Sequence, residues 1–542
     1  MKRIRGVFAT AGVMGAVTAA AILFGAGGST AQSPVTHNPQ DVAQHILSTK
    51  AAQLMTSPAR AALEMFAKGE RRFSGSRSKI DAPKAKTAIG GQSPPTPAFT
   101  NVRVNDPSTD THQIDQTTQS ETSVAVAGSN VAVGYNDSQQ GLLFLTAGAN
   151  LSGYAYSSDG GASWTDGGTI PNSTGLVNLG DPWLTSDRAG NMYYSTLAID
   201  AFTGLDVGVA RSTNGGRTWS MPVIASPTNV PFYLADKDAI VAGPDPSVKS
   251  RDNLYDTWDD FFCDDVSCFS GLPVARSTDG GASWQITYAD KVDLNLSGCS
   301  FTQYIGAQPI VDPKTGALFV AAEKFSVDDP DCTGTAPFQQ AEWIFRSTDG
   351  GQTFGPGVAI SDVTSAMPDG LLKLGPGQYM RTIEFPVMAF LGNALYVAWN
   401  DGSSGSSHIR LAKSVNNGQN WSLSWATQGT NDEVQPALSG DTSGLHLLHY
   451  RRNPNNTLDV FVANSTNGSS FVSRRVTTVS SPGVFTIPQF DPIIAFGYMG
   501  DYIANASDGT HQYFAWGDNR DRVTNFLWPN GRNDPDVFAA KQ

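Results

Sequence analysis

The 542-residue sequence lacks the short motifs that mark several common enzyme classes. It contains no G-x-S-x-G, no Walker loop, no H-E-x-x-H and no G-x-G-x-x-G fingerprint. These absences argue against the corresponding esterases, nucleotide-binding enzymes and zinc proteases. The seven histidines are scattered, and His446 and His449, which share one strand region, have no further ligands nearby, so we interpret both as structural.

Charge is also scarce, because only 16% of the residues are charged. Residues 1–100 carry 12 Lys and Arg against 4 Asp and Glu, whereas residues 101–542 carry 24 against 45, a net charge of −21. An acidic body of this size repels phosphate backbones, which argues against a nucleic-acid partner. The 55 glycines and 31 prolines, with 10% aromatic residues, are typical of a turn-rich folded chain.

Long apolar runs are absent beyond the N-terminus. Lys2, Arg3 and Arg5 precede an apolar run over residues 6–28 that ends in small residues near Ala31. This order predicts a signal peptide over residues 1–31, with an uncleaved anchor as the alternative. We therefore expect a secreted or periplasmic protein that has no membrane span after cleavage.

Cysteine is rare too. The four cysteines all lie between positions 263 and 332 and allow three pairings, of which we favour Cys263–Cys268 and Cys299–Cys332. Without paired C-x-x-C elements, a zinc site is not expected.

The segment between the signal peptide and residue 97 is expected to contain a helical leader over residues 32–70. Asn38 and Pro39 form a helix start, and apolar residues such as Ile46 follow one face. Residues 71–97 are rich in Ser, Gly, Pro and Lys and predict a linker. A propeptide, a spacer and a cell-surface contact all remain open for this leader.

One pattern recurs six times at fairly regular intervals along the chain. It reads Ser, any residue, Asp or Asn, any residue, Gly, two residues, then Trp or Phe. Ser and Asp side chains accept bonds from nearby backbone N–H groups and Gly adopts the left-handed conformation, so each copy predicts a hairpin turn. The copies are Ser157–Trp164, Ser212–Trp219, Ser277–Trp284, Ser347–Phe354, Ser414–Trp421 and the shorter, degenerate Ser465–Phe471.

A second unit alternates with these turns and contains two apolar strands joined by a Gly turn. Together the two repeats supply four strands per unit, which predicts an all-β propeller over residues 98–542. We expect seven blades, with six as the alternative. The seventh blade ends at Asp536–Ala540, and Thr100–Val104 is expected to supply its missing outer strand. The seven units are expected to begin at Glu121, Asp181, Lys237, Gln308, Glu384, Glu433 and Asp501.

The Ser-x-Asp-x-Gly-x-x-Trp turns resemble the Asp boxes, or BNR repeats, of the bacterial sialidase superfamily. The resemblance implies a propeller with its substrate site at one end of the central channel and its Asp boxes at the blade periphery, away from that site. It therefore implies a structural role in the turns for Asp159, Asn214, Asp279, Asp349 and Asn416.

Candidate site residues are those expected where the units enter the innermost strands. Crowded carboxylates raise one another's pKa, which supplies a general acid beside an ionised partner. Tyr379 recurs at the place of Tyr233, Tyr304 and Tyr498, and Arg381 stands where we align Gly306 and Gly500. Our candidates are Glu384, Arg381, Tyr379, Asp501, Asp181 and Lys237, with Glu121 and Glu433 adding further carboxylates to the same mouth.

These residues favour an exported glycoside hydrolase that acts on extracellular glycans through paired carboxylates. The resemblance also implies three substrate-gripping arginines, but the Arg-Ile-Pro motif that carries the first of them is absent, so sialidase activity is not expected. The alternatives are a non-catalytic propeller that binds a glycan or a protein, and a polysaccharide lyase. No cofactor is expected, except that acid-rich loops at Asp245–Asp260 and Asp328–Asp331 offer oxygen ligands for calcium. The oligomeric state stays open.

Overall fold

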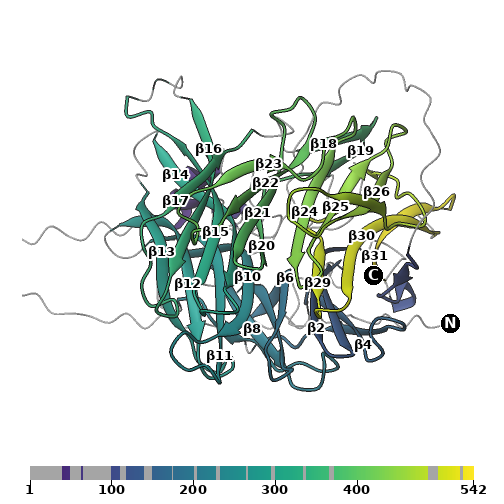
Figure 1. Cartoon of the computed structure of the whole chain (residues 1–542), viewed down its shortest axis with the longest axis horizontal. Helices are drawn as coiled ribbons and strands as arrows, with labels where there is room; N and C mark the ends of the chain where they lie inside the picture. The colour runs from purple at the N-terminus through teal and green to yellow at the C-terminus, as the bar shows by residue number, and fades with distance from the viewer. Residues whose placement is uncertain are drawn as a thin grey trace, which may run out of the picture. The chain divides into compact units, whose positions relative to one another are not determined.

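The computed structural model places most of the chain in antiparallel β-strands (Figure 1). It describes residues 39–48, 63–64, 67, 99–109, 118–138, 149–173, 175–199, 204–227, 232–263, 267–294, 300–331, 333, 337–364, 371–376, 378–485, 499–524 and 529–542. The predicted signal peptide and linker, as well as Cys299 and Cys332, lie outside these residues. The expected all-β class is confirmed. The described helical elements are α1 (Pro39–Ser48), residues 63–64 and 67, and the 3-10 turn η1 (Pro107–Thr109).

Most strands belong to four-stranded antiparallel sets that follow chain order, which is the pattern of propeller blades. We call each set a blade and name it by its innermost strand. The β2 blade contains β2 (Gln119–Ala127), β3 (Asn130–Asp137), β4 (Ser152–Ser157) and β5 (Thr165–Thr169). The β14 blade contains β14 (Phe301–Val311), β15 (Leu318–Val327), β16 (Phe338–Ser347) and β17 (Val358–Asp362). The β20 blade contains β20 (Val387–Leu391), β21 (Ala394–Asp401), β22 (His408–Ser414) and β23 (Ser422–Trp425), and the β24 blade contains β24 (Glu433–Gly440), β25 (Leu445–Arg452), β26 (Leu458–Ser465) and β27 (Val472–Arg475).

Two further blades are joined into one eight-stranded sheet by a short parallel pairing. Gly204 and Leu205 of β8 pair with Tyr233 and Leu234 of β10. Dividing the sheet there leaves two more four-stranded sets. The β6 blade contains β6 (Val177–Ser186), β7 (Met192–Ile199), β8 (Gly204–Ser212) and β9 (Val223–Ile224), and the β10 blade contains β10 (Phe232–Pro244), β11 (Asp252–Cys263), β12 (Cys268–Ser277) and β13 (Gln285–Asp293).

The last blade joins the two ends of the propeller. Its strands are β29 (Ala504–Ser507), β30 (Gln512–Val523), β31 (Arg532–Lys541) and β1 (Val102–Arg103). Val102 pairs with Ala539 and Arg103 with Phe538, which confirms the predicted closure. A separate three-stranded sheet contains β18 (Leu371–Gly375), β19 (Gln378–Arg381) and β28 (Val484–Phe485).

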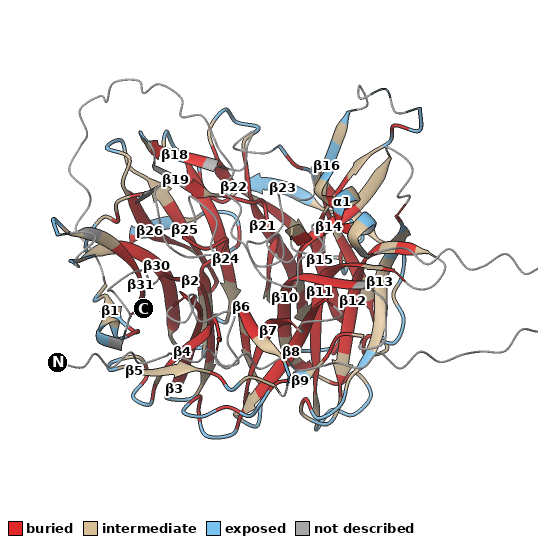
Figure 2. Ribbon diagram, turned by 180° about the vertical axis from the view of Figure 1, so that it is seen from behind, coloured by how far each residue is buried: buried red, intermediate tan, exposed pale blue. Residues whose placement is uncertain are grey.

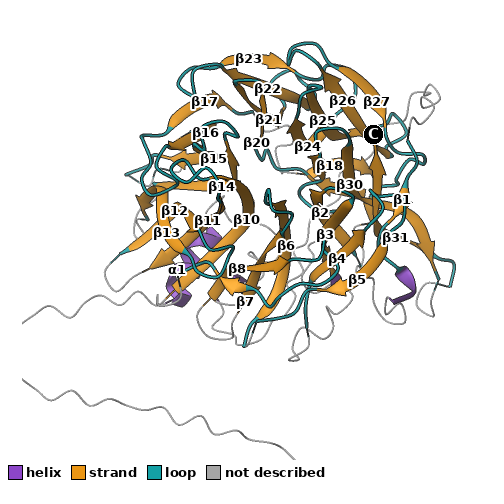
Figure 3. Ribbon diagram, turned by 60° about the horizontal axis from the view of Figure 1, so that its bottom comes forward, coloured by secondary structure: helices purple, strands orange, loops and turns teal. Residues whose placement is uncertain are grey.

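The innermost strands β2, β6, β10, β14, β20, β24 and β29 contact one another in a closed cycle. Figure 3 shows the blades arranged around a common axis, with β5, β13, β17, β23 and β27 on the outside. The chain is therefore a β-propeller. We call the end at which the innermost strands begin the entrance end, and the opposite end, where β4 and its equivalents finish, the turn end.

The six repeated turns lie at the turn end and follow the third strand of their blades. In the first copy, Ser157 Oγ accepts a bond from Gly161 N at 2.8 Å, and Asp159 Oδ1 accepts bonds from Ala162 N and Ser163 N at 3.0 and 2.9 Å. Asn416 repeats the arrangement by accepting a bond from Asn420 N at 3.0 Å. We call these six hairpins the Ser–Asp turns. Their side chains accept hydrogen bonds from backbone N–H groups of the turn, so their role is structural.

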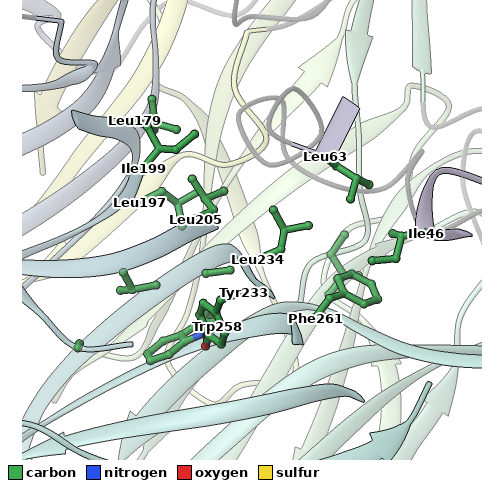
Figure 4. Packing of buried hydrophobic residues seen from close by; sticks show 14 of the residues in the cluster. Ile46, Leu63, Leu179, Leu197, Ile199, Leu205, Tyr233, Leu234, Trp258 and Phe261 are labelled. Carbon is green, nitrogen blue, oxygen red and sulfur yellow. Dashed lines mark hydrogen bonds between the residues drawn. The ribbon is translucent and has the colours of Figure 1, made fainter. Parts of the chain in front are cut away.

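Buried residues follow the strands, and exposed residues lie on the loops and outermost strands (Figure 2). One apolar cluster also includes the leader: Ala43 and Ile46 of α1, with Leu63 and Ala67, pack with residues of the propeller (Figure 4). Cys263 and Cys268 form the predicted disulfide between β11 and β12. No helix in the described part of the chain is long and apolar enough to span a bilayer.

Candidate functional site

A backbone bulge recurs in the innermost strands near the axis. The pairing of β2 with β3 shifts between Ser120 and Ser123, and β6, β10, β14 and β24 contain the same shift. The residue at the bulge has a positive φ, from +43° to +69°, which for a side chain other than glycine costs about 1–3 kcal/mol and occurs often at functional sites. These residues are Glu121, Asp181, Lys237, Gly306 and Gln435, and Gly500, just before β29, also has a positive φ.

Three of these bulges accept support from the preceding blade through a backbone N–H group. Asp181 N donates to Asn136 Oδ1 at 2.6 Å, and Gly306 N donates to Asp259 Oδ1 at 3.1 Å. Gln435 N donates to Asn400 Oδ1 at 3.3 Å in the same way. The acceptors occupy the same position in the second strand of their blades, so these hydrogen bonds fix neighbouring blades to one another at the hub.

Lys237 lies buried between aromatic rings at this hub. Its Nζ is 4.0 Å from the ring centre of Trp183 and 4.4 Å from that of Tyr502, and the residue is 3% exposed. Among the described residues Lys237 forms no ion pair, and its Nζ donates to the Asp238 carbonyl oxygen at 3.3 Å. Burial lowers the pKa of Lys237, although nearby Asp and Glu charges oppose this shift. Cation–π contacts thus hold its ammonium group.

Arg381 and Asp501 form a buried, two-pronged ion pair. Arg381 Nε donates to Asp501 Oδ1 at 2.6 Å, and its Nη2 contacts the second carboxylate oxygen. The Asp501 side chain is fully buried and that of Arg381 is 11% exposed. Gln435 Nε2 donates to the Arg381 and Gly500 carbonyl oxygens, and Asp501 N donates to Glu121 Oε1 at 3.0 Å. This arrangement neutralises Arg381 and holds it beside the bulges.

Four acidic side chains gather between the β14 and β20 blades. Glu342 on β16 lies directly opposite Glu323 on β15, and both are fully buried. Among the described residues, neither carboxyl oxygen of Glu342 has a hydrogen-bond partner. Burial raises the pKa of Glu342 well above its ordinary value, and the charges of Glu323, Glu384 and Asp401 raise it further. This shift favours the protonated form of Glu342, which is the form that can act as an acid.

A second acidic group surrounds Lys237. Burial raises the pKa of Asp238 and Asp259, and the nearby carboxylates of Asp256 and Asp236 add to the respective shifts. One position further along β11, burial raises the pKa of Asp260 to about 7, although it accepts hydrogen bonds from the hydroxyls of Tyr288 and Tyr233 at 2.7 and 3.1 Å. The hub therefore contains more carboxyl groups than cations.

A cavity of about 10 Å³ lies beside Lys237 and Asp501. Its wall includes Trp183, Lys237, Phe385, Gln435, Asp501 and Tyr502. This volume holds about one water molecule, so side chains fill the hub in this state.

The structure brings together several of the predicted site residues. Lys237 and Asp501 line the same cavity, Arg381 pairs with Asp501, and Asp181 is among the charges that act on Lys237. Glu384 is 2% exposed and belongs to the Glu342 group. The side chain of Tyr379 lies outside the described residues. Glu433 is apart, because its Oε1 accepts a bond from Arg451 Nε at 2.8 Å and its Oε2 contacts His408 Nδ1 at 3.1 Å.

The predicted alignment of Arg381 with Gly306 and Gly500 is wrong. Val387 pairs with Ala398, two residues before Asn400, and Ala239 pairs with Thr257, two residues before Asp259. Counting back two residues from each strand residue shows that Phe385 corresponds to Lys237 and Gly306. Arg381 instead belongs to β19, which pairs with β18 and β28 outside the blades. Unit starts at Gln308, Glu384, Glu433 and Asp501 are likewise one or two residues out of register, because the bulges add a residue that the sequence pattern does not mark.

Two further expectations are corrected. Tyr233 and Tyr304 do not occupy matching positions, because they lie four and two residues before their bulges. The acid-rich loop expected at Asp245–Asp260 is largely the strand β11, whose carboxyls are buried. Among the described residues no group of three or more His, Cys, Asp or Glu is arranged to hold a metal ion.

Sequence reasoning missed Glu342, Trp183, Phe385 and Tyr502. A glutamate interrupts an otherwise suitable strand pattern at Glu342, and this was the one signal that could have identified it. Phe385 occupies the position that corresponds to Lys237, and Trp183 and Tyr502 come two residues after Asp181 and Gly500. Their location at the hub can be predicted only once the bulges are located.

Comparisons with known proteins give distant matches. No family model matches the chain. A xyloglucanase of Hypocrea jecorina is 26% identical over 299 residues, which cover 52% of this chain and 30% of the xyloglucanase, so the match spans about a third of that protein. Among solved structures, an α-L-arabinofuranosidase of Fusarium graminearum in complex with an iminosugar inhibitor is 12% identical, with a TM-score of 0.42 over 67% of this chain and 92% of that one. A phage phi92 endosialidase is 10% identical, with a TM-score of 0.41 over 82% of this chain and 68% of that one.

Proposed function

We propose that the chain is an exported glycoside hydrolase of the Asp-box propeller type that cleaves extracellular glycans with the buried carboxyl groups between the β14 and β20 blades. The observation that carries this proposal is the buried pair of Glu342 and Glu323. Glu342 lies directly opposite a second carboxyl group on the neighbouring strand, and a buried carboxyl without a hydrogen-bond partner costs free energy. Such a cost without structural gain marks a functional group.

Glycoside hydrolysis needs one protonated carboxyl and one ionised carboxylate. The raised pKa of Glu342 suits it to protonate the leaving oxygen. Glu384, within the same group, is the proposed carboxylate that acts as base or nucleophile. Asp181, Lys237, Arg381 and Asp501 are proposed to bind sugar hydroxyls, and Tyr379 stays a candidate because β19 places it two residues from Arg381.

The charge of the hub favours a neutral glycan. Arg381, the arginine paired at the hub, is neutralised by Asp501, and Lys237 is outnumbered by carboxyl groups. A sialic acid or a uronic acid would add a further negative charge to this site. The likeness to a xyloglucanase supports the same class of substrate.

A non-catalytic glycan-binding propeller is the second candidate. The observation that favours it is the filled hub, in which the proposed catalytic carboxyls are at most 2% exposed and the cavity is about 10 Å³.

The test is release of reducing sugars from xyloglucan and arabinan, with sialyllactose and a uronic-acid polymer beside them. We expect activity on a neutral glycan and its loss in Glu342→Gln and Glu384→Gln. Asp536→Asn is the matched control, because burial also raises the pKa of Asp536, to about 8, but in the closing blade. Full activity in both glutamine variants would refute the proposed roles. Saturable binding of a glycan without any product would establish the binding alternative.

A further inference from the structure

Glutamate is rare in this chain, and in the propeller it is buried. Only seven of the 49 acidic residues are glutamates. The five that follow residue 100 are at most 2% exposed, although glutamate is almost never fully buried unless it is paired. Three of these five, Glu323, Glu342 and Glu384, belong to the acidic group between the β14 and β20 blades. The remaining two are Glu121 and Glu433.

The strand register of the β14 blade places amide side chains beside this acidic group. In one row Glu323 on β15 lies opposite Glu342 on β16, and in the next row Phe325 lies opposite Gln340. Gln303 on β14 completes the second row, which is the row nearer the entrance end. Side chains two residues apart on a strand point to the same face, so both rows project from one face of the blade.

The two opposed glutamates differ in their hydrogen bonding. Gln340 Nε2 donates to Glu323 Oε1. In the part of the chain that the structure describes, neither carboxyl oxygen of Glu342 has a hydrogen-bond partner. A hydrogen bond from an N–H group favours the ionised form of a carboxyl group. The bond from Gln340 therefore favours a carboxylate at Glu323 and leaves the protonated form to Glu342.

The charges around Glu342 act in the same direction. Burial raises the pKa of Glu342, and the charges of Glu323, Glu384 and Asp401 raise it further. Glu323 faces Glu342 from β15, Glu384 from the segment before β20, and Asp401 from the end of β21. A proton on Glu342 removes all three of these repulsions, whereas a proton on Glu323 removes one of them. Both effects therefore place the proton on the same residue.

We propose that Gln340 is a positioning residue that holds Glu323 as the carboxylate and thereby places the proton of this glutamate pair on Glu342. Gln340 is partly exposed near the start of β16 and acts through Glu323 rather than on the sugar. The proton is then held by the residue that hydrolysis needs as its acid. This catalytic consequence rests on the proposed function, whereas the location of the proton does not.

The location of the proton can be measured by 13C NMR on the full chain, with 13C only at the side-chain carboxyl carbon of glutamate. Seven glutamates give few signals, and the variants Glu342→Gln and Glu323→Gln assign the two of interest. In the unaltered protein at neutral pH, we expect a protonated carboxyl group at Glu342 and an ionised one at Glu323. Any other distribution would overturn the proposal.

Gln340→Met tests the cause of this distribution, because methionine keeps the unbranched shape of the side chain but has no N–H donor. We expect the proton to be shared between the two glutamates or to move to Glu323. The kcat of glycan hydrolysis should then fall about tenfold or more, because the acid is deprotonated more often. KM should not change, since Gln340 does not touch the sugar. Unchanged carboxyl signals in Gln340→Met would overturn the proposal.

Gln303→Met is the matched control for this variant. Gln303 lies in the same row as Gln340, but neither atom of its amide group has a hydrogen-bond partner among the described residues. This control should leave both carboxyl signals and kcat unchanged, and an effect equal to that of Gln340→Met would overturn the role of the Gln340 bond. If Gln340→Met fails to fold, the signals of the unaltered protein still decide where the proton lies.

Failure of this inference can be distinguished from failure of the proposed function. A proton on Glu342 that depends on Gln340, without hydrolysis of any glycan, would support the role of Gln340 and refute the proposed hydrolase. Hydrolysis that is lost in Glu342→Gln, with carboxyl signals that do not respond to Gln340→Met, would support the hydrolase and refute the role of Gln340.

Discussion

The pKa of an aspartate side chain shifts in opposite directions at the two ends of the blades. At the turn end, Asp349 is partly exposed and accepts hydrogen bonds from Thr353 Oγ1 at 2.6 Å and from Gln352 N and Thr353 N at 3.0 Å, which hold its pKa at about 2. Near the entrance end, burial raises the pKa of Asp260 to about 7 despite two hydroxyl donors. A carboxyl group surrounded by backbone donors stabilises a turn, whereas a buried one costs stability and keeps its proton for chemistry.

The largest expected effect is on catalytic activity, which should depend on Glu342 and not on the turn end. Glu342→Gln keeps the shape of the side chain but removes its exchangeable acid proton, so we expect glycan hydrolysis to fall about 10²–10⁴-fold. The melting temperature should stay the same or rise, because a buried ionisable group is lost. Asp349→Asn, at the turn end, should leave kcat/KM unchanged. An equal loss of activity in Asp349→Asn and Glu342→Gln would contradict the assignment of a structural role to Asp349 and a catalytic role to Glu342.

The ion pair at the hub gives the next largest effect. Asp501→Asn leaves the buried Arg381 guanidinium without its carboxylate, which we expect to cost about 3–5 kcal/mol in urea-induced unfolding. The comparison is Asp521→Asn, because Asp521 pairs with Arg103 and their side chains are 32% and 38% exposed. That pair should contribute less than about 1 kcal/mol. Equal losses in the free energy of unfolding of the two variants would show that burial does not determine how much each ion pair contributes.

The third prediction concerns pH. The folded state raises the pKa of Asp260 above its usual value of about 3.8, so the folded state binds more protons and stability falls as pH rises from about 4 to 7. The shift corresponds to about 4 kcal/mol at most. Asp260→Asn should remove this decline, so the variant becomes relatively more stable at pH 8 than at pH 4. Chemical denaturation across this range measures it, and an unchanged slope would show that Asp260 is ionised in the fold.

The smallest effect belongs to the Ser–Asp turns. Asp349→Ala removes the acceptor for two backbone N–H groups and should cost about 1 kcal/mol in chemical denaturation. Because the folded state lowers the pKa of Asp349, its contribution is present above about pH 4 and is lost as pH falls towards 2. Asp349→Asn should cost less, since Asn416 performs the same role in its own turn. A loss as large as that expected for Asp501→Asn would mean that the turn also supports the blade interior.

The architecture was predictable because its signals repeat. Six Ser–Asp turns and their alternating strand pairs establish four strands per unit, and the short strand at Val102 was identifiable because the last unit lacked a partner. The pairing of Cys263 with Cys268 was likewise foreseeable from their closeness in the sequence. Each of these features depends on residues close together in sequence or on a pattern that recurs.

The site was less predictable because it is built where the pattern breaks. A bulge inserts a residue that no sequence pattern indicates. The sequence therefore led us to align Arg381 with Gly306, although the structural counterpart of Gly306 is Phe385. Glu342 gains its raised pKa from burial and from Glu323, Glu384 and Asp401, which come from other segments, and no local pattern reports that convergence. Lys237 was selected because it interrupts the acidic pattern, but its aromatic neighbours come from the β6 blade, from residue 502 and from residue 385.

The pairing of β1 with β31 sets an order of events during biosynthesis. Val102 cannot pair until Ala539 has been synthesised, so the circle stays open while all the strands between them are being made. A variant that lacks only β31 would lose little mass and yet leave β1 and β30 without the strand that lies between them. Assembly of the whole ring should therefore be most sensitive to changes in this one strand.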